Sequence, residues 1–72
     1  SIDEALTMAD KIAVMSAHPG TLLANIDVPF ARPRELGAVR SDPAFAELFN
    51  YIWEMLRREV MRSRDVQEAG AR

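Results

Sequence analysis

The chain has 72 residues, 49% of them hydrophobic, and its nine basic and eleven acidic residues give a net charge of −2. This composition is too apolar for a disordered segment, and without a basic surplus it gives no reason to expect nucleic acid as a partner. A single histidine and no cysteine argue against a zinc site and disulfides, and no apolar run approaches the roughly 20 residues that span a bilayer.

The first ten residues predict a short helix that begins at the first residue of the chain. Ser1 can accept hydrogen bonds from the free N–H groups of the first turn while Glu4 reaches back, which is the Ser-x-x-Glu capping box. One narrow apolar face follows from the spacing of Ile2, Ala5, Leu6 and Ala9. A chain this small is hard to stabilise alone, and its first residue already caps a helix. We therefore expect it to be part of a larger domain.

Residues 12–16 and 21–28 predict two strands joined by a tight turn. The run Ile12–Ser16 is nearly all apolar, as expected for a strand covered on both faces, and that cover must come from elsewhere. The second run alternates, with one face formed by Leu22, Ala24, Ile26 and Val28. The sequence His18-Pro19-Gly20 predicts the turn, with a positive φ at Gly20. We expect an antiparallel hairpin at the edge of a sheet.

A loop and a long helix complete the predicted elements. Pro29–Val39 contains two prolines, a glycine and two arginines, which predicts an extended loop with little regular structure. Asp42 is a strong N-cap and Pro43 is favoured at the first helical position, so a helix of about twenty residues is expected from there. The polar, small residues from Asp65 onward predict a frayed tail. The predicted order is therefore helix, strand, strand, loop and long helix, and the predicted fold class is α+β.

The long helix carries a wide apolar stripe, formed by Phe45, Leu48, Phe49, Ile52, Leu56 and Val60 with Trp53 beside them. Three roles are open for this stripe: packing in a core, forming an interface, or lying on a membrane surface. The polar side of the helix carries Glu47, Glu54 and Glu59 as well as arginines, which argues against an anionic membrane. Core packing is favoured, and an interface is the second interpretation.

Several polar residues are candidates for a functional role. The paired carboxylates Asp3 and Glu4 sit on a helix N-terminus, where capping and the helix dipole explain them better than acid–base catalysis. His18 lies beside Pro-Gly and is interpreted as a solvated turn residue, not a metal ligand. Three loop arginines could bind phosphate or lipid headgroups, but a solvated loop is favoured for them: Arg32, Arg34 and Arg40.

Five stretches, taken together and in order, resemble the ATP-binding subunits of ABC transporters, most closely the nitrate, sulfonate and taurine importers. They are Glu4-Ala5 with Ala9-Asp10-Lys11, then Ala17-His18-Pro19-Gly20, Arg32-Pro33-Arg34, Ser41-Asp42-Pro43-Ala44-Phe45, and Trp53 to Arg57. The resemblance runs from Ser1 to about Val60. It departs from the family at His18, where arginine is commoner, and at Ser1, where aspartate is more usual.

The resemblance implies that the chain is the C-terminal part of such a subunit, following the switch histidine. Residues 1–40 would form the helix and edge hairpin after that histidine, residues 41–64 the C-terminal helix, and residues 65–72 a flexible tail. Ser1, Glu4 and Ala5 would support the switch loop from behind. Neither the phosphate-binding loop nor the strand ending in Asp-Glu occurs in residues 1–72. No residue here is therefore expected to be catalytic, to bind a cofactor or to bind a metal.

The family also implies the setting of the whole subunit. ATP and Mg²⁺ would be its cofactors, and its partners would be a second ATP-binding subunit and a membrane permease. It would lie in the cytoplasm, peripheral to the inner membrane, without inserting into it. A different class of function stays open: a stand-alone module that dimerises through the long helix. That alternative explains the apolar stripe but not the strand that is apolar on both faces.

Overall fold

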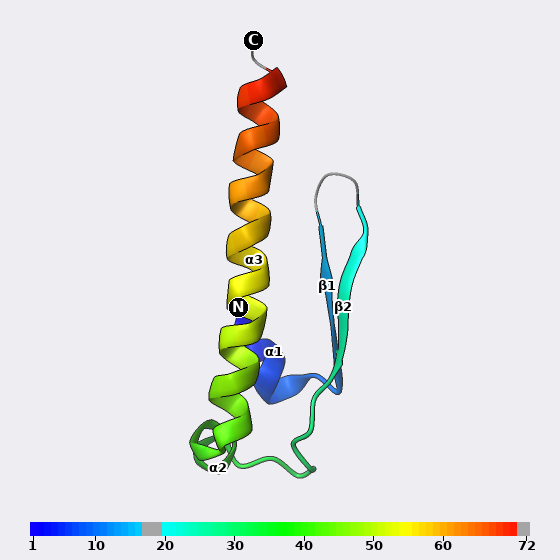
Figure 1. Cartoon of the computed structure of the whole chain (residues 1–72). Coiled ribbons are helices and arrows are strands. Elements are labelled where there is room, and N and C mark those ends of the chain that lie inside the picture. Colours follow the sequence, from blue (N-terminus) through cyan, green and yellow to red (C-terminus); the bar gives the residue numbers. More distant parts are fainter. Residues whose placement is uncertain (17–19, 71–72) are drawn as a thin grey trace.

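The described part of the chain, residues 1–16 and 20–70, forms three helices and one antiparallel hairpin in this computed structural model, with side chains described up to residue 64. The elements are α1 (Ile2–Met8), β1 (Lys11–Met15), β2 (Leu22–Asp27), α2 (Leu36–Ser41) and α3 (Pro43–Gly70), and Figure 1 shows α3 as the longest of them. A short helix, a hairpin and a long helix confirm the predicted α+β class.

The two strands pair antiparallel, as predicted. Ile12 lies opposite Ile26 and Val14 opposite Ala24, with an irregularity after Val14. The far end is closed by Ser16, whose N–H donates to the carbonyl of Thr21 at 2.8 Å. The predicted turn residues His18 and Pro19 lie outside the described residues. No glycine in residues 1–16 and 20–70 has a positive φ, so the left-handed conformation predicted for Gly20 is absent, and the backbone bond of Ser16 closes the hairpin without it.

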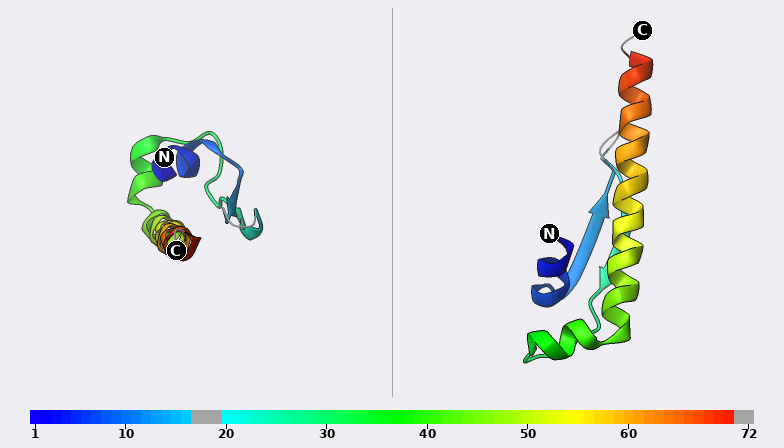
Figure 2. Two further views of the ribbon diagram at one scale, coloured as in Figure 1. Left: turned by 90° about the horizontal axis from the view of Figure 1, so that it is seen from above. Right: turned by 90° about the vertical axis from the view of Figure 1, so that its left-hand side faces the viewer.

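Two buried clusters hold the elements together. The first joins Leu6 of α1, Val14 of β1 and Ile52 of α3, and Leu6 is fully buried. The second joins Val28, Phe30 and Val39. Seen from above in Figure 2, α3, α2, α1 and the hairpin follow one another in an arc. The two ends of this arc are α3 and the hairpin, and in the first cluster both of them pack against α1.

Helix α2 corrects the prediction of an extended loop over Pro29–Val39. The carboxylate of Glu35 accepts hydrogen bonds from the N–H groups of Gly37 at 2.9 Å and Ala38 at 2.7 Å. These bonds hold the pKa of Glu35 below its ordinary value. Glutamate is not among the preferred N-cap residues, and the prolines and glycine around it indicate a loop. The burial of Val39 in the second cluster favours the helix in spite of this local sequence.

Helix α3 begins as predicted and runs further than predicted. Asp42 caps it, because its carboxylate accepts from the N–H of Ala44 at 2.9 Å, and Pro43 is the first helical residue. The helix continues to Gly70, through residues that the sequence predicts as a frayed tail. Residues 65–69 contain no proline or glycine and include good helix formers, so nothing in their propensity ends the helix earlier.

The apolar stripe of α3 divides into a packed half and an exposed half. Ile52 is 3% exposed, and the residues before it pack against the two clusters: Phe45, Leu48 and Phe49. Beyond Ile52 the exposed fractions rise to 41% for Leu56 and 52% for Val60. Core packing is therefore confirmed only for the first half of the stripe.

Within the described residues only one face of β1 is covered, and the cover expected for the other face would come from elsewhere. Val14 is buried on one face of β1, whereas Met15 on the other face is 52% exposed. Leu22 and Leu23 of β2 are also exposed. Only the face that packs against α1 and α3 has a cover.

The chain is elongated. Its radius of gyration is 14.9 Å and its extents are 51 × 18 × 14 Å, whereas a compact domain of this length has a radius of gyration of about 11 Å. Figure 1 shows the reason, since the second half of α3 projects beyond α1 and α2.

Leu6→Ala is expected to lower the free energy of unfolding by about 2–5 kcal/mol, because it opens a cavity where α1, β1 and α3 meet. Met8→Ala is the matched control on the same helix: Met8 is 70% exposed, and its loss is expected to cost less than about 0.5 kcal/mol. Urea unfolding of the complete domain that is expected to contain this chain measures both values. Equal losses in the two variants would contradict the assignment of Leu6 to the core.

Candidate functional site

The three residues that the sequence predicts as supports of the switch loop lie together on the first turn of α1. The hydroxyl of Ser1 accepts from the N–H of Glu4 at 3.4 Å, and the carbonyl of Ser1 accepts from the N–H of Ala5 at 3.1 Å. Ser1 and Glu4 are exposed and Ala5 is half-buried. The Ser1 half of the capping box is thus present, and Ser1 is tied to the helix at its very start.

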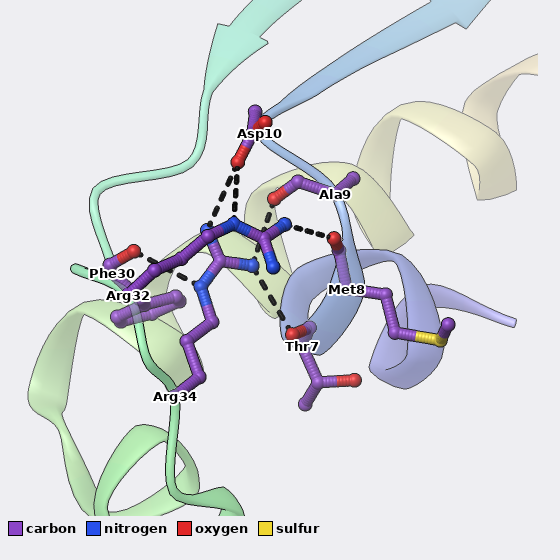
Figure 3. A network of polar contacts seen from close by, with 7 residues as sticks. All are labelled: Thr7, Met8, Ala9, Asp10, Phe30, Arg32 and Arg34. Atoms are coloured by element: carbon purple, nitrogen blue, oxygen red, sulfur yellow. Dashed lines mark hydrogen bonds and ion pairs between the residues drawn. The ribbon is translucent and has the colours of Figure 1, made fainter.

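Arg34 connects the opposite end of α1 to the segment that follows β2. Its Nη1 donates to the carbonyls of Thr7 at 3.1 Å and Ala9 at 2.8 Å, and its Nε donates to the carbonyl of Phe30 at 3.0 Å. The side chain of Arg34 is only 5% exposed. Figure 3 shows the guanidinium inserted between the end of α1 and the loop.

Arg32 binds the same helix end from the solvent side. Its Nη2 donates to the carbonyl of Met8, and its Nε donates to the carboxylate of Asp10 at 3.0 Å. Its side chain is 55% exposed, so the ion pair with Asp10 is screened by water and contributes little by itself. Together Arg32 and Arg34 satisfy three consecutive carbonyls, and we call this pair the arginine clamp (Figure 3).

The clamp corrects the interpretation of these arginines as solvated loop residues. The last turn of α1 contains no basic residue, and the last carbonyls of any helix lack partners within it. Cations also suit the negative end of the helix dipole. A short helix with no basic residue near its end is the signal that could have pointed to Arg32 and Arg34. Arg40 remains at the surface, 3.9 Å from the carboxylate of Asp3.

An apolar groove runs between α1, β1 and the exposed half of α3. One part, of about 500 Å³, is lined by α1 and α3 through Ile2, Trp53, Leu56, Arg57, Val60, Met61 and Arg64. A second part, of about 430 Å³, lies between α1, β1 and α3 and shares Ile2 and Leu56 with the first. The two parts therefore adjoin at Ile2 and Leu56.

Charges on α3 pair with one another along the helix. Arg57 donates to Glu54 through Nε at 3.0 Å and Nη2 at 2.6 Å, and Arg58 lies 3.3 Å from the same carboxylate. The hydrogen bonds from Arg57 hold the pKa of Glu54 below its ordinary value. Within the described residues, no three His, Cys, Asp or Glu side chains gather as a metal site, and His18 lies outside them.

Arg57→Ala is expected to raise the pKa of Glu54 toward its ordinary value of 4.5, because the largest cause of the lowering is the hydrogen bond from Arg57. In the wild type, the folded pKa lies below the unfolded one. The pair therefore stabilises the helix above the unfolded pKa and loses that effect as the pH falls through the folded one. Carboxyl NMR titration measures the shift. Arg62→Ala is the control, since Arg62 pairs with Glu59. If Arg62→Ala raised the pKa of Glu54 as much as Arg57→Ala does, the hydrogen bond from Arg57 would not be the cause of the lowering.

Comparison with known proteins finds relatives over most of the chain. It is 37% identical over 65 residues to the nitrate import ATP-binding protein of Synechococcus elongatus, a match that covers 89% of this chain and 24% of that protein. It is 38% identical over 56 residues to a bicarbonate transport ATP-binding protein of Synechocystis, covering 76% of this chain and 20% of that protein. A putative ATP-binding protein of Brucella melitensis is 37% identical over 54 residues.

The chain thus spans 20–24% of the length of these relatives. No family model matches the chain, and no solved structure matches it significantly. The matches nonetheless cover most of this chain, from 72% to 89% of it. The chain therefore belongs to the ATP-binding subunits of ABC importers of the nitrate and bicarbonate type.

Proposed function

We propose that the chain forms the structural support behind the nucleotide switch of an ABC importer subunit. In this proposal α1 directly follows the switch histidine, and Ser1, Glu4 and Ala5 hold the end of the switch loop. The observation that carries it is the similarity to nitrate and bicarbonate ATP-binding proteins over most of the chain. The capped first turn of α1 supports it, because the hydroxyl and the carbonyl of Ser1 both accept hydrogen bonds from that turn.

The whole subunit would couple ATP hydrolysis to the import of a small anion. The relatives are named for nitrate import and bicarbonate transport, and both of these anions are small and planar. Sulfonate and taurine remain predictions from the sequence. No phosphate-binding motif occurs in residues 1–72, and no three possible metal ligands gather among the described residues. We assign both cofactors to the rest of the subunit.

The exposed apolar surface supports a position inside a larger domain. Trp53 is 49% exposed and Val60 52% exposed, and both line the groove beside α1. Contiguous exposed apolar surface of this kind marks a contact with another surface. The relatives have more than three quarters of their length outside the match. We propose that the corresponding part of this subunit covers the groove.

The expected partners and location follow from the same proposal. A second ATP-binding subunit and a membrane permease would complete the transporter, and the subunit would lie on the cytoplasmic side of the inner membrane. No helix within the described residues is long and apolar enough to cross a bilayer.

The coding sequence upstream of Ser1 tests the proposal directly. A histidine is expected immediately before Ser1, and a phosphate-binding motif Gly-x-x-x-x-Gly-Lys-(Ser/Thr) within roughly 200 residues, the length that the match leaves out of the nitrate relative. An upstream sequence with neither motif would refute this function.

The isolated 72-residue chain should not bind ATP, and it should fold poorly or aggregate. Its core contains few fully buried side chains, and Trp53, Leu56 and Val60 are exposed. Titration calorimetry and sedimentation velocity measure the two properties. Micromolar affinity for ATP would contradict the first expectation. A well-folded, discrete dimer would favour the alternative of a stand-alone dimerisation module, which the exposed half of α3 also fits.

A further inference from the structure

We propose that Arg34 is a positioning residue for the nucleotide switch: it locks α1 from its C-terminal end and so fixes the residue that precedes Ser1. The inference rests on the proposed function, in which that residue is the switch histidine. It is carried by the arginine clamp, whose guanidinium groups hold the carbonyls of Thr7, Met8 and Ala9 (Figure 3).

Helix α1 depends on contacts such as those of Arg34 because it is too short to be stable by itself. It has seven residues, and isolated helices shorter than about 12 residues are marginal in water. The burial of Leu6 presses α1 against α3 and β1, but apolar contact is not directional. Rotation about Leu6 is opposed by the hydrogen bonds of Arg34, which also anchor the helix to Phe30.

Because α1 is short and rigid, a change in its orientation at the clamped C-terminal end displaces Ser1 at its N-terminal end. Seven helical residues span about 10 Å, so a tilt of about 10° at the clamped end would move Ser1 by about 2 Å. A catalytic group misplaced by about 1 Å can lose about 10²-fold in rate. Ser1 follows the motion of α1 because its hydroxyl and carbonyl are both bound by the first turn.

The same geometry argues against a ligand site at these arginines. Arg34 is 5% exposed, and its Nε and Nη1 are already engaged by three carbonyls. Arg32 is directed at Met8 and Asp10. Arg34 is also the stronger member of the clamp, since it joins two separate segments from a buried position, whereas Arg32 is half exposed. Lysine cannot replace it, because one ammonium lacks the planar set of donors.

The test uses the full-length subunit that contains this chain, with Arg34→Lys as the variant and Arg58→Lys as its matched control. Arg58 lies on α3 with its side chain 75% exposed. ATP hydrolysis is measured as kcat per nucleotide-binding site and as KM for ATP. We expect Arg34→Lys to lower kcat at least about tenfold with KM within about twofold of wild type. Arg58→Lys is expected to change neither.

A fall in kcat with an unchanged KM distinguishes a positioning effect from a general loss of structure. Unfolded subunits bind no nucleotide, so they are not counted among the nucleotide-binding sites by which the rate is divided. Hydrogen exchange gives a second readout: the amides of Ala5 and Ala9, which close α1, should exchange faster in Arg34→Lys only. If Arg34→Lys does not fold, Arg32→Ala replaces it, with the same direction expected for kcat and exchange.

Two outcomes overturn the inference in distinguishable ways. A folded Arg34→Lys subunit with wild-type kcat per site overturns the positioning role and leaves the proposed function intact. A folded wild-type subunit that does not hydrolyse ATP overturns the proposed function, and the positioning role with it.

Discussion

The rest of the structure depends on one contact, in which Leu6, Val14 and Ile52 meet in a buried cluster. Each side chain comes from a different element, and neither a seven-residue helix nor a two-stranded hairpin is stable alone in water. Helix α3 supplies the surface on which both of them pack. Its own first half is stabilised in return, because the burial of Ile52 removes the centre of the apolar stripe from water. The short elements and the long helix are therefore ordered together.

The arginine clamp adds direction to this apolar contact. Burial of Leu6 determines that α1 lies against α3, but it allows the helix to turn. Hydrogen bonds from a planar guanidinium have preferred geometry, and Arg34 makes them to both the end of α1 and the loop after β2. The combination explains how α1 can hold one orientation with so few residues. The loop between β2 and α2 thereby has a structural role, since its two arginines donate hydrogen bonds to the last carbonyls of α1.

The groove beside α1 and the open face of the hairpin share one physical origin. Both are apolar surfaces that the described part of the chain does not cover, from Met15 on β1 to Val60 on α3. The chain spans 20–24% of the length of its relatives, and in the proposed function the rest of the subunit would cover these surfaces. The elongated shape has the same cause: the second half of α3 extends beyond the elements that this chain can pack against it.

Local signals were sufficient for the capped start of α1, the paired strands, the start of α3 at Asp42-Pro43 and the family, because each depends on residues close together in sequence. They failed at α2, where the cap by Glu35 and the burial of Val39 favour a helix, and at Gly70, where propensity alone sets no boundary. They failed most clearly at Arg34. A loop arginine looks solvated in sequence, and only the fold brings it within 3.1 Å of the carbonyls of Thr7 and Ala9. The sequence by itself thus determined α1, the two strands and the start of α3, through caps and periodicity. The tertiary structure alone decided how α1 is held and which half of the α3 stripe is buried, because both depend on contacts between residues more than twenty positions apart.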